Sequence, residues 1–135
     1  MDPTILPPDL QEVVKHHTHL CPGVLLGYRA CKYAFDLIGK SDRMLVVASN
    51  ENCGNDAVKV LLNCSKEAGT LIILAAQRQS LSFYNYEEDE GVSLILNPVI
   101  GKQFSSDRNQ DIQEIMNLPD NVLFIVEPFE PGMEK

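Results

Sequence analysis

The densest group of possible metal ligands in this chain lies near its N-terminus, at His17, His19 and Cys21. Imidazole nitrogen and thiolate sulfur together suit zinc, and other late first-row metals such as nickel bind the same donors. Three such side chains within five positions, followed directly by Pro22-Gly23, favour a metal or catalytic site over unrelated surface or core residues. We therefore predict that His17, His19 and Cys21 are metal ligands.

The spacing of these ligands limits how they could share one ion. In an extended segment their side chains point to one face, but His17 and Cys21 would be ~13 Å apart at the backbone, so a straight strand would use only one adjacent pair. In a helix, His17 and Cys21 would meet at i, i+4, although Pro22 biases Cys21 away from helical angles. Either the chain bends sharply before Pro22, or a ligand from elsewhere completes the site.

A second candidate segment, residues 51–57, lies where an apolar strand is expected to end and a helix to begin, a frequent place for ligand sites in open α/β sheets. Cys53 would have its thiolate favoured by the helix dipole and by free N–H groups, and we predict that it is a further metal ligand. Glu51 and Asp56 are predicted to act as catalytic acid or base. The alternative is that Asn52 and Asp56 only cap the helix.

The other two cysteines are weaker candidates. Cys64 is eleven residues from Cys53, which corresponds to ~16 Å along a continuous helix, so the two cannot bind one ion together. Cys53 is the better partner for the histidine cluster, although the sequence leaves open which of the two completes the site. Cys31 lies in the middle of an apolar helical face and is expected to pack in the core.

The elements that must position these residues follow from apolar periodicity and turn residues. Helices are expected at residues 9–16, 22–38, 54–64 and 110–118, with strands at 43–49, 70–76, 81–86, 91–96 and 122–126. Asp9 with Glu12 resembles a capping box, and Gly39 fits the position after a helix. Helices alternating with strands, followed by a late hairpin, predict an α+β fold in which a mixed β-sheet has helices packed on it.

Length and composition set the class of protein. The 135 residues indicate one domain, spanning 1–135, and 44% of them are apolar. The formal charge of −8 argues against nucleic acid as the main partner, because phosphate binding needs clustered Lys and Arg.

The sequence has no apolar run of roughly 20 residues and no N-terminal signal-peptide pattern, so we expect a cytoplasmic protein without a membrane partner. Thiols stay reduced there, which favours metal binding, catalysis or packing over disulfides for the four cysteines.

Several segments together resemble the FmdE family, which is named after formylmethanofuran dehydrogenase, over roughly residues 10–100. They are His17-Thr18-His19-Leu20-Cys21-Pro22-Gly23, Gly27-Tyr28-Arg29-Ala30, Glu51-Asn52-Cys53-Gly54-Asn55-Asp56-Ala57 and Ser82-Phe83-Tyr84-Asn85. The resemblance implies an α+β core that forms a homodimer and carries a cleft with His and Cys side chains.

The chain departs from the family pattern in two places. A glycine-rich loop of the family is reduced to Asn63-Cys64-Ser65-Lys66-Glu67-Ala68-Gly69, and no cysteines for the family's C-terminal zinc finger follow Val126. The resemblance implies a zinc-binding accessory protein associated with molybdenum or tungsten formylmethanofuran dehydrogenase, with a larger redox enzyme as partner. The alternative function is a metal-dependent enzyme that uses an open His/Cys site on a small substrate.

Overall fold

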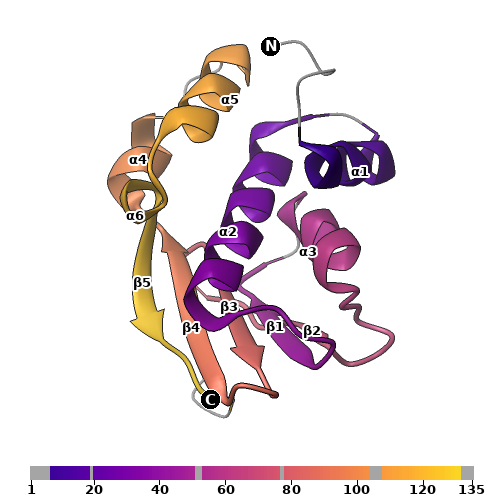
Figure 1. Ribbon diagram of the computed structural model, residues 1–135. Coiled ribbons are helices and arrows are strands. Elements are labelled where there is room, and N and C mark those ends of the chain that lie inside the picture. Colours follow the sequence, from indigo (N-terminus) through magenta and orange to yellow (C-terminus); the bar gives the residue numbers. More distant parts are fainter. Residues whose placement is uncertain (1–6, 19, 51–52, 77, 104–107, 132–135) are drawn as a thin grey trace.

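The computed structural model describes residues 7–18, 20–50, 53–76, 78–103 and 108–131 (Figure 1). The helices are α1 (Pro8–His17), α2 (Pro22–Ile38), α3 (Gly54–Leu62), α4 (Pro98–Gln103), α5 (Arg108–Asn117) and α6 (Asp120–Leu123). The strands are β1 (Met44–Ala48), β2 (Leu71–Ile73), β3 (Ser80–Asn85), β4 (Glu90–Leu96) and β5 (Phe124–Pro128). Among the described helices, none combines the length and the apolar character that a bilayer span requires.

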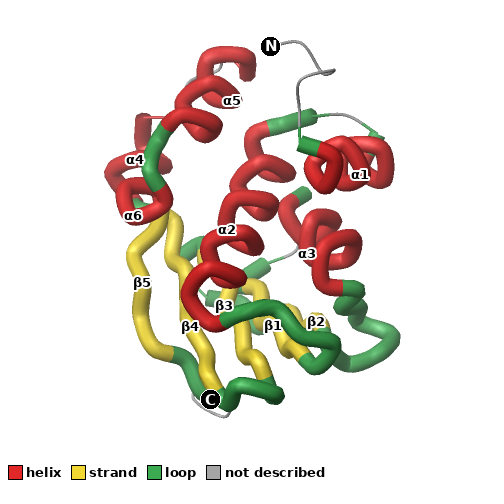
Figure 2. The backbone as a smooth tube through the Cα atoms, in the orientation of Figure 1, coloured by secondary structure: helices red, strands yellow, loops and turns green. Residues whose placement is uncertain are grey.

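The strands form one mixed sheet in the order β2-β1-β3-β4-β5. Strands β1 and β2 are parallel, as expected for two strands joined through α3, whereas the other three pairings are antiparallel. Helix α2 crosses in front of the sheet in Figure 2 and packs on β3 and β4, while α3 packs on α2 and β1. This arrangement confirms the predicted α+β fold with helices packed on a mixed sheet.

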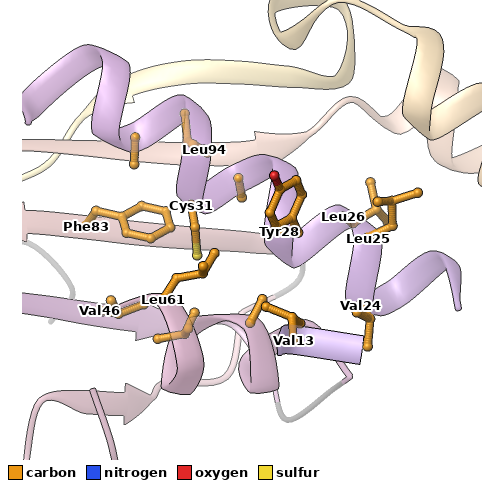
Figure 3. Close-up of a cluster of buried hydrophobic side chains, with 14 of the residues drawn as sticks. Val13, Val24, Leu25, Leu26, Tyr28, Cys31, Val46, Leu61, Phe83 and Leu94 are labelled. Atoms are coloured by element: carbon orange, nitrogen blue, oxygen red, sulfur yellow. The ribbon is translucent and has the colours of Figure 1, made fainter. Parts of the chain in front are cut away.

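Helix α2 supplies much of the core because both its ends and its apolar face are well specified. Pro22 opens it at the first turn, where the missing N–H is not needed, and Gly39 ends it with φ +78° and donates its N–H to the Phe35 carbonyl. The side chains that it buries, which Figure 3 shows in part, include Val24, Leu25, Ala30, Cys31 and Ala34. Val46 and Phe83, cross-strand neighbours on β1 and β3, lie fully buried in the same cluster.

Side chains alternate across the sheet, so the same strands also present a second face. Leu45, Val47 and Tyr84 point to it and form a smaller buried cluster with Phe129. Gly91 allows the segment after β5 to lie close, because a Cβ at Gly91 would lie 2.2 Å from the Phe129 carbonyl oxygen.

Five elements differ from the sequence-based expectations, namely α4, α6, β5, β2 and the start of α1. Helices α4 and α6 were not predicted. Because α6 includes Val122, β5 begins only at Phe124 and not at the predicted residue 122. Strand β2 is shorter than predicted because only Leu71–Ile73 pairs with β1. The predicted N-cap at Asp9 is wrong: Pro7 is the N-cap, and Asp9 lies in the first turn, where its carboxylate accepts the Leu10 N–H at 2.8 Å.

The segment Gly27-Tyr28-Arg29 has a structural role at each position. A Cβ at Gly27 would lie 2.4 Å from the Gly54 carbonyl oxygen, so the close approach of α2 and α3 depends on glycine there. The Tyr28 hydroxyl donates to Asp9 at 2.9 Å and ties α2 to α1. The Arg29 guanidinium donates to the carbonyls of Ile115 and Leu118 at the end of α5, and also to Asp120. These three residues therefore hold α1, α3 and α5 around α2.

Asn85 joins the β3–β4 turn to the end of α2 and is fully buried. Its amide donates to the Ile38 carbonyl at 3.0 Å, while its Oδ1 accepts hydrogen bonds from the Ser41 hydroxyl and from the backbone N–H groups of Glu87 and Glu88. A buried side chain with this many partners fixes the turn geometry.

Candidate metal centre

Three helix ends meet at one point of the molecule and bring three potential ligands together. His17 is the last residue of α1, Cys21 directly precedes α2, and Cys53 directly precedes α3. One ring nitrogen and the two sulfur atoms all lie within 4.8 Å of one another. No other group of this kind occurs among the residues that the structure describes.

His17 and Cys21 belong to different elements, because α1 ends at His17 and α2 begins at Pro22. Thr18 adopts the left-handed conformation with φ +87° and donates its N–H to the Val14 carbonyl at 2.7 Å, which ends α1. Cys21 is extended, at φ −137° and ψ 163°, as its position before Pro22 predicts. The turn leaves the Cys21 sulfur 3.8 Å from His17 Nε2. The sequence offered a bend after α1 and a distant cysteine as alternatives; the structure has a left-handed Thr18 after α1 and also places Cys53 beside His17 and Cys21.

Glycines allow Cys53 to reach this position. Gly54 lies close to Gly27, and Cys53, which directly precedes Gly54, is therefore held near the first half of α2. A Cβ at Gly23 would lie 3.2 Å from the Cys53 Cβ, so the backbone of the first turn of α2 lies against the Cys53 side chain. The small residues of α2 thus set the distance between Cys53 and Cys21.

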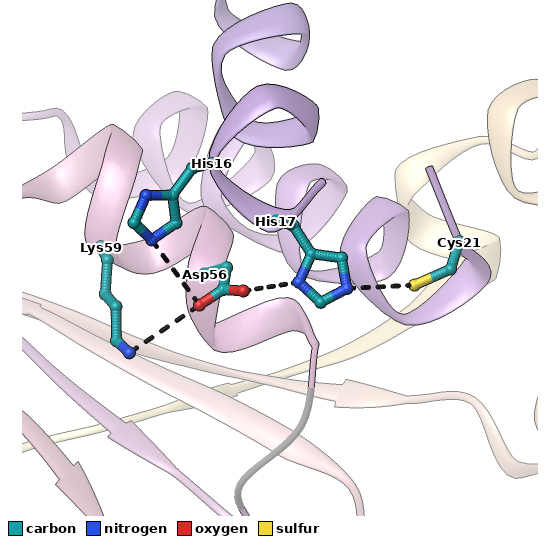
Figure 4. A network of polar contacts seen from close by, with 5 residues as sticks. All are labelled: His16, His17, Cys21, Asp56 and Lys59. Atoms are coloured by element: carbon teal, nitrogen blue, oxygen red, sulfur yellow. Dashed lines mark hydrogen bonds and ion pairs between the residues drawn. The ribbon is translucent and has the colours of Figure 1, made fainter. Parts of the chain in front are cut away.

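Asp56 orients the His17 ring (Figure 4). Its Oδ2 lies 2.5 Å from His17 Nδ1, whereas its contacts with His16 and Lys59 are longer, at 3.9 and 3.8 Å. With Nδ1–H donated to the carboxylate, Nε2 carries the lone pair and faces the Cys21 sulfur. A carboxylate behind a histidine in this way is the usual outer partner of a metal-bound imidazole.

The pKa of the Cys53 thiol is raised, chiefly by burial and then by the hydrogen bond and charge of Cys21 and the charge of Asp56. A backbone hydrogen bond at the start of α3 lowers the pKa of Cys53, in the direction expected for a helix N-terminus, but burial, Cys21 and Asp56 outweigh it. A cation between the two sulfur atoms would reverse this balance, since thiolate is the form that binds metal.

The distances fit a zinc ion. With Zn–N of about 2.0–2.1 Å and Zn–S of about 2.3 Å, the edges of a tetrahedral site are ~3.6 Å between nitrogen and sulfur and ~3.8 Å between two sulfurs. The observed nitrogen–sulfur distance is 3.8 Å, and no distance in the group exceeds 4.8 Å. Side-chain movements below ~1 Å would thus complete three corners of a tetrahedron.

The remaining predicted residues divide into three groups. His19 and Glu51 lie outside the described residues. Asp56 makes no side-chain cap on α3, so the capping alternative does not account for it; it contacts His17 instead. Cys64 is buried with its sulfur 3.6 Å from the Met44 carbonyl and takes no part in the cluster, and Cys31 is buried in the core.

Sequence reasoning missed two features of the site. The contact of Asp56 with His17 joins residues 39 positions apart, and no local spacing signals such a pair. Gly23 was recognised only as part of the segment after Cys21, whereas its missing side chain makes room for Cys53.

Comparisons with known proteins agree with this fold. The model of the family described as "FmdE, molybdenum formylmethanofuran dehydrogenase operon" matches residues 16–125. A solved structure, of a tungsten formylmethanofuran dehydrogenase FmdE-like protein from Syntrophus aciditrophicus, superposes with a TM-score of 0.69 at 21% identity, covering 93% of this chain and 73% of that one. No curated protein matches. Since the family model spans most of the sequence, including both segments of the candidate site, the chain belongs to the FmdE family.

Proposed function

We propose that this chain is a zinc-binding accessory protein whose metal is held by His17, Cys21 and Cys53. The observation that carries the proposal is the convergence of one imidazole nitrogen and two sulfur atoms within 4.8 Å, from three different helix ends. The hydrogen bond from His17 to Asp56 supports it, because it turns Nε2 of the ring toward the Cys21 sulfur. His19 stays our predicted further ligand.

Zinc is the metal that this donor set favours. Two soft thiolates with one imidazole suit zinc better than the hard, oxygen-preferring cations magnesium and calcium. Nickel and other late first-row metals bind the same donors, so the metal found in the purified protein decides between them.

Family membership supports an association with molybdenum or tungsten formylmethanofuran dehydrogenase, in which this chain would serve a larger redox enzyme. Thiolate ligands need a reducing environment, and we accordingly propose that the protein works in the cytoplasm.

We also propose that two copies form a homodimer through the second face of the sheet. Ile72 and Ile125 lie on that face, at its two opposite edges, and are 40% and 41% exposed, so large apolar side chains reach solvent at both edges. Light scattering should give twice the chain mass, and Ile72→Lys should shift the protein toward monomer. A monomeric wild-type protein would refute this part of the proposal.

Metal analysis of protein purified without an affinity tag tests the zinc site. We expect about one zinc per chain in the wild type, retention in Cys64→Ala, and loss in Cys53→Ala. The two variants make the same chemical change at cysteines on either side of α3, so the comparison separates ligand loss from general destabilisation. Full metal content in Cys53→Ala would show that the site assignment is wrong.

A second function, a metal-dependent enzyme, is favoured by one observation: the described residues supply three ligands, which leaves a fourth tetrahedral position. Zinc with an open position activates water or polarises a carbonyl group. In this alternative Glu51 and Asp56 would handle protons, as predicted from the sequence. Adding azide to the cobalt-substituted protein distinguishes the two functions, because azide changes the visible spectrum only where a position is open.

A further inference from the structure

Cys21 and Cys53 place two reduced thiols side by side at the proposed metal centre. Both cysteines are free, and their sulfur atoms lie within 4.8 Å. A disulfide bond is about 2.05 Å long, so the sulfurs would need to approach by at most about 2.8 Å, a movement that rotation of the two side chains can share.

The backbone around the pair is already close. Because Gly23 has no side chain, the Cys53 Cβ lies against the chain two residues after Cys21, 3.2 Å from where a Gly23 Cβ would be. A disulfide forms without strain only between backbone segments that lie close together, and the contact at Gly23 places Cys53 against the segment that follows Cys21. Cys31 and Cys64 differ, because both are enclosed in the core, with exposed fractions of 0% and 3%.

We propose that the metal-free protein closes Cys21 and Cys53 into a disulfide in the presence of a small-molecule disulfide, and that this bond blocks metal loading. The inference rests on the proposed function, since it assigns redox regulation to the same site. A disulfide sulfur is no longer a thiolate, so His17 would be the one ligand left of the three. Bound metal, in turn, would hold both sulfurs and protect them.

The reaction is a thiol–disulfide exchange in two steps. Cys53 is the more accessible of the two, since Cys21 is only 6% exposed. The Cys53 sulfur attacks one sulfur of glutathione disulfide, whose S–S bond breaks and releases the first glutathione. The Cys21 sulfur then attacks the Cys53 sulfur and displaces the second. Two electrons pass from the protein to glutathione disulfide, and the two cysteine protons end on the two glutathione thiols.

The test uses the full chain, with metal removed by a chelator in one sample and with zinc added in a second. Both are treated with glutathione disulfide, alkylated and digested with trypsin. Cleavage at Lys and Arg leaves each cysteine on its own peptide, namely 16–29, 30–32, 44–59 and 60–66. The pairing can therefore be identified directly by mass spectrometry, and Cys64→Ala serves as a matched control that keeps both proposed partners.

We expect the metal-free protein to lose two hydrogen atoms and to yield peptide 16–29 linked to 44–59, in the wild type and in Cys64→Ala alike. The oxidised protein should bind no zinc until it is reduced, and the zinc-loaded sample should stay reduced. A protein that binds zinc but forms no such link would overturn the inference while leaving the zinc site intact. A protein that forms the link but never binds zinc would instead overturn the proposed function.

Discussion

Replacement of Asp56 by asparagine should weaken zinc binding without removing any of the three ligands. The 2.5 Å contact with His17 Nδ1 is the shortest that Asp56 makes, and the His17 side chain is only 14% exposed. Loss of such an outer carboxylate typically lowers metal affinity 10–100-fold. Because a quarter of the Asp56 side chain is exposed to solvent, we expect the lower end of this range, about tenfold or about 1.4 kcal/mol.

Competition with a chromophoric chelator at constant pH measures this change. Asp36→Asn is the matched control, because it removes the same charge from an exposed position on α2. We expect the control to bind zinc as the wild type does. Wild-type affinity in Asp56→Asn, or an equal loss in both variants, would show that the carboxylate does not act through the His17 ring.

Three further predictions concern the elements that position the site. Gly27→Ala should destabilise the protein by about 1–3 kcal/mol and weaken zinc binding, because the new methyl group would meet the Gly54 backbone at 2.4 Å; unchanged denaturant midpoint and affinity would contradict this. Arg29→Lys should reduce the unfolding free energy by about 1–3 kcal/mol, since lysine cannot reproduce the guanidinium contacts at the end of α5, and a wild-type melting curve would refute the role given to this side chain. Burial alone would raise the pKa of the Asp9 carboxyl, but hydrogen bonds from Lys32 and Tyr28 outweigh it and lower the pKa. The stability that Asp9 contributes is therefore present above its unfolded pKa of about 3.9 and is lost as the pH falls further. The stability difference between wild type and Asp9→Asn should therefore be largest near neutral pH and shrink below about pH 4, and a pH-independent difference would count against the charged contact.

The sequence predicted the main elements because their signals are local. Helix α2 has a proline at its start, a glycine after its end and apolar residues at helical spacing, and the structure confirms all three. The hairpin of β3 and β4 follows from two apolar strands around an acidic turn. Helix α6 was missed because its four residues are too few to show periodicity.

The candidate site was predictable in its residue types but not in its geometry. Spacing alone left both an extended and a helical arrangement open for His17 and Cys21, and the left-handed Thr18 that resolves them gives no strong sequence signal. The position of Cys53 depends on contacts of Gly23 and Gly27 with a segment about 30 residues away. The raised pKa of Cys53 likewise depends on burial and on Cys21, which only the folded chain brings near.

X-ray absorption spectroscopy of the zinc-loaded protein tests the central claim most directly, because it counts the sulfur atoms bound to the metal. If Cys21 and Cys53 are ligands together with His17, the spectrum should show two sulfurs at about 2.3 Å and imidazole nitrogen at about 2.0–2.1 Å. Cys53→Ala should lose one of the two sulfurs or the metal altogether. A zinc ion surrounded only by nitrogen and oxygen would contradict the claim that these three helix ends form the metal centre.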